Sequence, residues 1–245
     1  KCTTGYHQKG INGKPLFISA RRQFLGICFG GAKKQNIMFK EAVSRKTLQA
    51  LDLVVHSRAM PPHTYLAGGT AIALHLGHRH SYDLDFFVNK RFDAKDTVRK
   101  LKKIKEYRLE KMSWQTVLGY IENIQCTLFF YQYPLLINAH EFQGCKIADL
   151  KDLAAMKIAA LSDRGVKRDF VDLYFIIRAG GIGLKEALEL YGNKFRVLEA
   201  NRLHILRSLT YFADAENQRM PRMIKGVSWQ EVKKFLEKET KKLII

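Results

Sequence analysis

Two stretches decide the fold of this chain: Tyr65-Leu66-Ala67-Gly68-Gly69-Thr70 and, further on, Tyr82-Asp83-Leu84-Asp85-Phe86-Phe87. The first predicts a short strand, a turn at Gly68-Gly69 and a helix over Ala71–Leu76 that Thr70 can cap. Glycines let the backbone approach a ligand closely, and the free amides at a helix start attract phosphate oxygens. We therefore expect Gly68, Gly69 and Thr70 to form an anion site.

The second stretch predicts a strand over Tyr82–Val88 that carries two carboxylates. Side chains alternate along a strand, so Asp83, Asp85 and Phe87 share one face. Two like charges on one face cost stability unless a cation neutralises them. Oxygen ligands beside phosphate suit Mg²⁺, with Mn²⁺ as an alternative. We predict that Asp83 and Asp85 are catalytic metal ligands; a solvated acidic strand edge is the alternative.

Around these stretches, the pattern predicts an α+β part that is followed by a helical part, with the boundary near Asp149. We expect domains at 38–148 and 149–245. Further strands are expected over Tyr107–Lys111, Thr116–Ile121, Gln125–Tyr131 and Cys145–Ala148. Helices are expected over Lys46–Ser57, Ala94–Ile104, Asp149–Ser162, Lys167–Arg178, Leu184–Tyr191, Val197–Asp214 and Ser228–Lys242.

A second group of candidate residues lies in the helical part. Lys157 interrupts an apolar stripe, so its ammonium must reach solvent or meet an anion. Arg164 follows, and Asp169 and Asp172 share a helix face. These two aspartates could cap the helix, pair with nearby arginines or complete the metal site, and the sequence leaves these alternatives open.

Three histidines, His75, His78 and His80, precede the acidic strand. No cysteine, HExxH or carboxylate spacing supports a zinc site there. We instead expect His78 and Arg79 to contact a nucleotide or phosphate.

The composition bears on partners and on localisation. Lys and Arg number 42 against 23 Asp and Glu, a net charge of +19, which favours a polyanionic partner such as nucleic acid. No apolar run is long enough to span a bilayer, so no membrane partner is expected. The four scattered cysteines form no framework, which favours a reducing cytoplasm.

Residues 1–37 differ from the rest of the chain. They hold seven Lys and Arg but no Asp or Glu, and show no periodicity. Arg21-Arg22 resembles a twin-arginine export signal, but no small-residue cleavage site follows it. We expect 1–37 to be a non-native or disordered extension, with Met38 as the natural start.

Several motifs together resemble the AbiEii/AbiGii toxin-like nucleotidyltransferase family. They are Leu66-Ala67-Gly68-Gly69-Thr70-Ala71, Gly77-His78-Arg79-x-Ser81-x-Asp83-Leu84-Asp85-Phe86-Phe87, Asp152-Leu153-Ala154-Ala155-Met156-Lys157, and the segment from Arg164 to Tyr174. The resemblance runs from about Met38 to the end of the chain. It implies a mixed sheet of the DNA polymerase β nucleotidyltransferase type, flanked by helices and followed by a helical part.

The resemblance also implies an activity: transfer of a nucleoside monophosphate from an NTP to an RNA hydroxyl, such as a tRNA end. Gly68-Gly69-Thr70 and Lys157 would then hold the triphosphate, Asp83 and Asp85 would hold Mg²⁺, and Asp169 or Asp172 would assist. Family members act as toxins in toxin–antitoxin or phage-defence pairs, so a cognate antitoxin is an expected partner.

One departure from the superfamily pattern matters. A third carboxylate commonly stands on a neighbouring strand, but Ile124–Phe130 contains no acid. Either an aspartate of the helical part replaces it, or catalysis is impaired. Two alternatives to the transferase on RNA therefore remain: a nucleotide- or RNA-binding protein that has lost catalysis, and a small-molecule nucleotidyltransferase of the antibiotic-modifying kind.

Overall fold

The computed structural model describes residues 38–196 and 201–243. The expectations for 1–37, including the start at Met38 and the twin-arginine motif, concern residues outside this part. Among the described residues, no helix has both the length and the apolar character that crossing a membrane requires.

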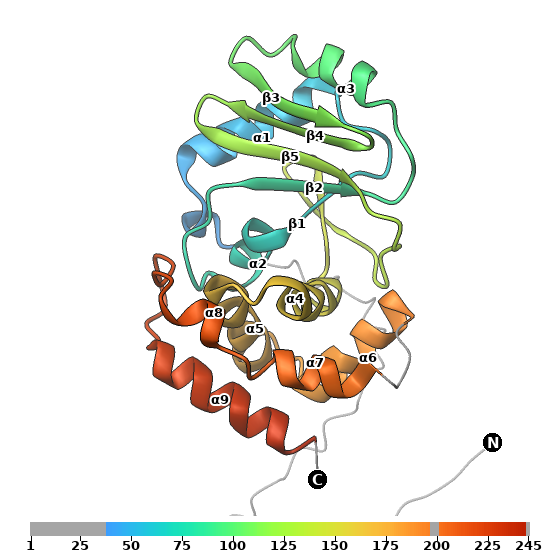
Figure 1. Cartoon of the computed structure of the whole chain (residues 1–245). Coiled ribbons are helices and arrows are strands. Elements are labelled where there is room, and N and C mark those ends of the chain that lie inside the picture. The colour runs from blue at the N-terminus through green and yellow to red at the C-terminus, as the bar shows by residue number, and fades with distance from the viewer. Residues whose placement is uncertain (1–37, 197–200, 244–245) are drawn as a thin grey trace, which may run out of the picture. The chain divides into compact units, whose positions relative to one another are not determined.

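A seven-stranded mixed sheet has the strand order β3-β4-β5-β2-β1-β7-β6 (Figure 1). The pairs β1–β7 and β2–β5 are parallel and the remaining neighbours are antiparallel. The strands are β1 (Tyr65–Ala67), β2 (Leu84–Val88), β3 (Tyr107–Ser113), β4 (Thr116–Ile121), β5 (Ile124–Phe130), β6 (His140–Phe142) and β7 (Cys145–Ile147).

Helices cover the sheet unevenly. The helices α1 and α3 pack on β5, β4 and β3, whereas α2 lies between the sheet and the pair α4 and α5 (Figure 1). The remaining helices pack around α4 and α5. The bounds are α1 (Arg45–Ser57), α2 (Gly68–Leu76), α3 (Ala94–Leu101), α4 (Leu150–Arg164), α5 (Lys167–Ala179), α6 (Leu184–Phe195), α7 (Arg202–Ser208), α8 (Ala213–Glu216) and α9 (Trp229–Lys241). A short 3-10 turn, Lys40–Ala42, precedes α1.

The α+β prediction is confirmed, but three local predictions are wrong. Helix α2 begins at Gly68 and is preceded by Ala67, so Thr70 is not its cap. The Thr70 hydroxyl instead donates to the Asp83 carbonyl and is also hydrogen-bonded to the Ser81 hydroxyl. Strand β2 begins at Leu84 rather than at Tyr82, and the three-residue strand β6 was not predicted.

The predicted helix over Val197–Asp214 is also wrong, because α7 ends at Ser208 and α8 begins at Ala213. At this break the centroid of the Phe212 ring lies 5.0 Å from that of Phe170 and 5.6 Å from that of Trp229. The last helix, α9, begins with a capping box in which Ser228 and Glu231 each bond the other's backbone amide.

Candidate active site

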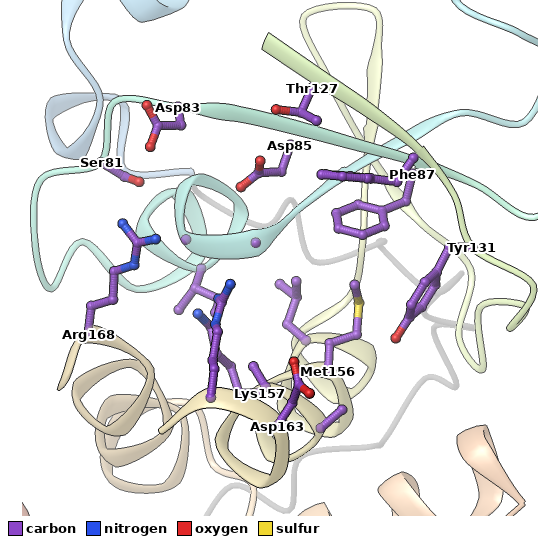
Figure 2. A pocket seen from close by; sticks show the side chains of 18 of the residues that line it. Ser81, Asp83, Asp85, Phe87, Thr127, Tyr131, Met156, Lys157, Asp163 and Arg168 are labelled. Atoms are coloured by element: carbon purple, nitrogen blue, oxygen red, sulfur yellow. The ribbon is translucent and has the colours of Figure 1, made fainter. Parts of the chain in front are cut away.

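A cavity of about 740 Å³ opens between the sheet and α4. One wall is the face of β2 that carries Asp85 and Phe87, while Leu84, Phe86 and Val88 on the opposite face are buried in the core. Asp83, directly before β2, lines the same cavity. Figure 2 shows Asp83, Asp85 and Phe87 pointing from this wall toward α4.

The start of α2 reaches this wall through two glycines. Gly68 has a φ of +68°, and a Cβ there would stand 2.7 Å from Asp85 Oδ2. A Cβ at Gly69 would stand 2.3 Å from Arg79 Nη2. Neither position has room for a side chain, so the first backbone turn of α2 lies directly against Asp85 and Arg79.

Among the described residues, no cation lies within ion-pair distance of the Asp83 or Asp85 carboxylate, although the charges of Lys157, Arg168 and Arg164 act on Asp85 from farther away. Burial, and then the neighbouring charge of Asp83, raise the pKa of Asp85 above its ordinary value. Two oxygen-bearing groups that repel each other at the edge of a cavity suit a hard divalent cation.

The opposite wall is basic. Lys157 of α4 and Arg168 of α5 point toward the aspartates across the cavity (Figure 2), and Arg164 also lines it. Lys157 Nζ lies 2.6 Å from Asp169 Oδ1 and 2.7 Å from Asp172 Oδ2. An ammonium has three N–H donors, so two hold Lys157 in place and one is left for a ligand in the cavity.

Asp172 is surrounded by donors. Its Oδ1 accepts from Arg79 Nε at 2.6 Å and lies 2.8 Å from His78 Nε2, and its Oδ2 accepts from Arg79 Nη2 at 2.9 Å and from Lys157. Burial alone would raise the pKa of Asp172, but Lys157, Arg79 and His78 hold it well below its ordinary value. This carboxylate is fully buried and does not line the cavity.

Asp169 has a similar environment. It is fully buried, accepts from Lys157, and accepts at Oδ2 from Arg164 Nε at 3.0 Å. These cations outweigh burial and lower the pKa of Asp169. The structure therefore brings both predicted aspartates to the basic wall, one layer behind the cavity surface.

The predicted substrate contact of His78 needs correction. His78 is fully buried, its ring is held by Asp172, and it does not line the cavity. Arg79 does line the cavity, although Asp172 clamps its guanidinium. Thr70 does not line the cavity, but its hydroxyl donates a hydrogen bond to the backbone carbonyl of Asp83.

Thr127 lies on β5, the neighbouring strand on which the family resemblance implies a third carboxylate. In the parallel register of β2 and β5, Asp85 is directly beside Thr127, and both line the cavity (Figure 2). Within the described part of the chain, no three His, Cys, Asp or Glu side chains gather in a way that could hold a metal ion. Three carboxylates line the cavity: Asp83 and Asp85 on the sheet side, and Asp163 of α4 on the opposite side.

The sequence did not reveal an aromatic wall at one end of the cavity. We use this name for Phe87, Phe129, Tyr131, Tyr133 and Phe195, which all line it. Ring centroids lie 5.3 Å apart for Phe87 and Tyr131, 5.3 Å for Tyr131 and Tyr133, and 4.7 Å for Tyr133 and Phe195. The alternation along β2 did place Phe87 on the face of the aspartates, but no local signal marks Phe195 on α6.

A buried ion pair fixes this wall. Lys194 Nζ lies 2.6 Å from Asp152 Oδ1 and donates to the Pro134 carbonyl at 2.7 Å. Asp152 also accepts from the backbone amides of Leu136 and Ile137. The pair thus joins α6, α4 and the segment that carries Tyr133.

Comparisons with known proteins agree with this geometry. A family model described as "Nucleotidyl transferase AbiEii toxin, Type IV TA system" matches residues 54–134 and 130–242. The uncharacterized protein aq_aa25 of Aquifex aeolicus (strain VF5) is 35% identical over 208 residues, which are 82% of this chain and 98% of that protein.

Two solved structures share the fold. MenT4, a nucleotidyltransferase toxin from Mycobacterium tuberculosis H37Rv, matches with a TM-score of 0.55 and 15% identity over 78% of this chain and 80% of its own. JHP933 from Helicobacter pylori matches with a TM-score of 0.50 and 18% identity over 84% of this chain and 95% of its own. The chain belongs to the AbiEii nucleotidyltransferase toxin family and is a nucleotidyltransferase.

Proposed function

We propose that this enzyme transfers a nucleoside monophosphate from an NTP to a hydroxyl of RNA, with a tRNA end as the expected acceptor. The observation that carries the proposal is the cavity itself. An acidic wall with Asp83 and Asp85 faces a basic wall with Lys157, Arg164 and Arg168, and the amides of α2 lie between them.

Asp83 and Asp85 would hold Mg²⁺, with Mn²⁺ as the alternative. Their fit to a divalent cation rests on the raised pKa of Asp85 and on the absence of a protein cation beside either carboxylate among the described residues. A bound ion of this kind lowers the pKa of the attacking hydroxyl and offsets charge on the phosphates.

The basic wall would bind the triphosphate. The first amides of α2 offer donors to phosphate oxygens, and Lys157 offers the N–H that its two carboxylate partners leave unused. Arg164 has a half-exposed side chain that reaches the same cavity. These donors would hold the pyrophosphate leaving group in line with the attacking hydroxyl.

Asp169 and Asp172 would act as positioning residues. Arg79, His78 and Lys157 occupy all the hydrogen-bond acceptor positions of the Asp172 carboxylate. None remains to bind a metal ion or to accept a substrate proton. By holding Lys157 and Arg79 in place, the two aspartates would orient these cations toward the phosphates of the NTP.

The direct test is incubation of the full chain with each labelled NTP, Mg²⁺ and total RNA. We expect label from one NTP on a discrete RNA band, and no label with the Asp85→Ala variant. Label that appears equally with Asp85→Ala would refute the site, and label on a small molecule only would refute the acceptor.

One observation favours a second candidate. Thr127, beside Asp85, supplies no third carboxylate, as in a nucleotide-binding protein that has lost catalysis. Under this alternative, NTP would raise the melting temperature of the protein while no RNA, small molecule or protein acquires label.

We also propose that the enzyme is the toxin of a toxin–antitoxin or phage-defence pair and acts in the cytoplasm. The description of the matching family model supports this role. Induced expression in a bacterial host should arrest growth, and Asp85→Ala should not. Relief of the arrest by the product of a neighbouring gene would identify the antitoxin, whereas normal growth with the intact enzyme would contradict the role.

A further inference from the structure

The cavity face of the sheet continues beyond the cavity. Register places Thr127 of β5 beside Asp85, Leu118 of β4 beside Thr127, and Lys111 of β3 beside Leu118. Residues paired across neighbouring strands point to the same face, so this row leads from the acidic wall to the sheet edge. Three strand spacings put Lys111 about 14 Å from Asp85.

A parallel row is made by Gln125, Tyr120 and Arg108. Gln125 lines the cavity, so this row also begins at the proposed site. The Arg108 guanidinium lies 4.7 Å from the centre of the Tyr120 ring. The Arg108 Nη1 atom also pairs with Glu110 Oε2 at 2.9 Å, an exposed ion pair, and the guanidinium and the ring together offer a surface on which a base can stack.

These outer residues remain accessible. Along β4, Leu118 and Tyr120 are half-buried, whereas Val117 and Ile121 on the opposite face are buried beneath the α1 and α3 side of the sheet. Arg108 and Lys111 are exposed. Figure 1 shows α1 passing behind β3, β4 and β5, with no drawn helix in front of β3 and β4. We call Leu118, Tyr120, Arg108 and Lys111 the open face.

The sheet edge beside the open face is basic. Residues 102–111, which follow α3 and lead into the edge strand β3, contain five Lys and Arg but two Glu. At the turn between β3 and β4, the Trp114 side chain is 70% exposed and Arg91 stacks over its ring at 5.6 Å. Trp114 also contacts Phe130, which lines the cavity. Exposed rings among cations are typical of single-stranded nucleic-acid binding.

We infer that the open face binds the single-stranded end of the acceptor RNA and leads its terminal hydroxyl past Thr127 to Asp85. The inference rests on the proposed function, because it assumes an RNA acceptor. Tyr120 and Arg108 stack with an unpaired base, and Lys111 contacts a phosphate. The charge of this edge favours RNA over a protein partner, which would need a larger apolar surface.

The test measures binding without chemistry. Fluorescence anisotropy of a short labelled single-stranded RNA is recorded with the full chain and with Tyr120→Ala and Lys111→Glu. Tyr211→Ala and Lys234→Glu are matched controls, because both side chains are exposed and lie in the helical part. The KM values for RNA and for NTP are measured on the same variants.

We expect Tyr120→Ala and Lys111→Glu each to raise the Kd for RNA about tenfold. The salt slope of binding should decrease by about one for Lys111→Glu. The KM for NTP should stay unchanged, and the controls should stay within about twofold of the wild type.

Two results would overturn the inference while leaving the proposed function intact. One is transfer to RNA by the intact enzyme together with open-face variants that bind RNA as the controls do. The other is unchanged RNA binding with loss of binding to an antitoxin protein. If the intact enzyme neither binds RNA nor labels it, both the inference and the RNA acceptor are wrong.

Discussion

Two pairs of aspartates belong to opposite sides of the cavity, one at its surface and one buried behind it, and they have opposite environments. Asp83 and Asp85 have no ion-pair partner among the described residues, and burial raises the pKa of Asp85. Asp169 and Asp172 are fully buried, yet Lys157, Arg79 and Arg164 lower their pKa values.

The difference shows why spacing alone does not assign a role to a carboxylate. Lys157, Arg79 and Arg164 balance the charge of Asp169 and Asp172 within the protein. We therefore expect this pair to stabilise the fold and to orient these cations. The first pair is left unbalanced, at a cost in stability, and this imbalance is what a metal ion can relieve. Removing a carboxylate should therefore have opposite consequences on the two walls.

The sharpest way to break this comparison is Asp85→Asn. We expect nucleotide transfer to fall on the order of a thousandfold or more, because a proposed metal ligand is lost. The melting temperature should stay the same or rise, since one of two repelling charges is removed. Labelled-NTP transfer and thermal unfolding measure both effects. Substantial residual transfer, or a marked loss of stability, would show that Asp85 is structural.

On the other wall, Asp172→Asn should mainly destabilise the fold. The change leaves Arg79 and Lys157 without their common counter-charge, which costs about 3–5 kcal/mol in the free energy of unfolding for a buried pair. Urea unfolding measures this loss, and the variant Lys242→Gln, which removes an exposed ion pair at the end of α9, is the control that should stay within about 1 kcal/mol. An Asp172→Asn protein that keeps both its stability and its KM for NTP would contradict the positioning role.

Between the two walls, Gly68→Ala tests the contact of α2 with the aspartates. The positive φ of Gly68 and the 2.7 Å approach of a Cβ to Asp85 Oδ2 both oppose a side chain. We expect a loss of about 1–2 kcal/mol in stability and a larger KM for NTP, because Asp85 and the first turn of α2 must move apart. As a control, Gly192→Ala lies in α6 with open space around it, so it should leave the KM for NTP unchanged and raise stability by about 0.5–1 kcal/mol.

The smallest expected effect is a pH dependence from the second pair and its neighbour. Burial lowers the pKa of His78, although Asp172 opposes this, so the unfolded chain takes up a proton near pH 6.5 that the folded chain refuses. Stability should therefore decline as the pH falls below about 6.5. The lowered pKa values of Asp169 and Asp172 add a second decline below about pH 3.8.

Melting temperatures between pH 8 and pH 3 measure this profile, and His78→Gln should flatten the upper decline only. An unchanged upper decline in that variant would assign it to another group. A rise in stability on acidification would contradict the sign of the His78 shift.

The acidic wall was predictable because its signals are local. Alternation along β2 predicted the face of Asp85, and the double glycine indicated a close approach of the backbone, which the first turn of α2 makes to Asp85 and Arg79. The basic wall was only partly predictable. The contact between Arg79 and Asp172 joins residues far apart in sequence, and no short-range pattern indicates it.

The wrong helix prediction and the missed aromatic wall also depend on contacts between residues far apart in sequence. The helix over Val197–Asp214 looked continuous by periodicity, but Phe212 leaves it to pack on Phe170 and Trp229. The aromatic wall likewise depends on α6, whose Phe195 reaches Tyr133 only in the folded chain. Tertiary packing decided both cases, and periodicity does not report it.

The buried pair of Lys194 and Asp152 has a consequence for how a ligand is received. Because it ties α6 and the Pro134 carbonyl to α4, the rings of the aromatic wall are ordered before any ligand arrives. The conformational entropy of that wall is lost once, during folding, and is not lost again with each binding event. Removing the ion pair between Lys194 and Asp152 should therefore weaken ligand binding through a less favourable entropy of binding, although neither residue touches the ligand itself.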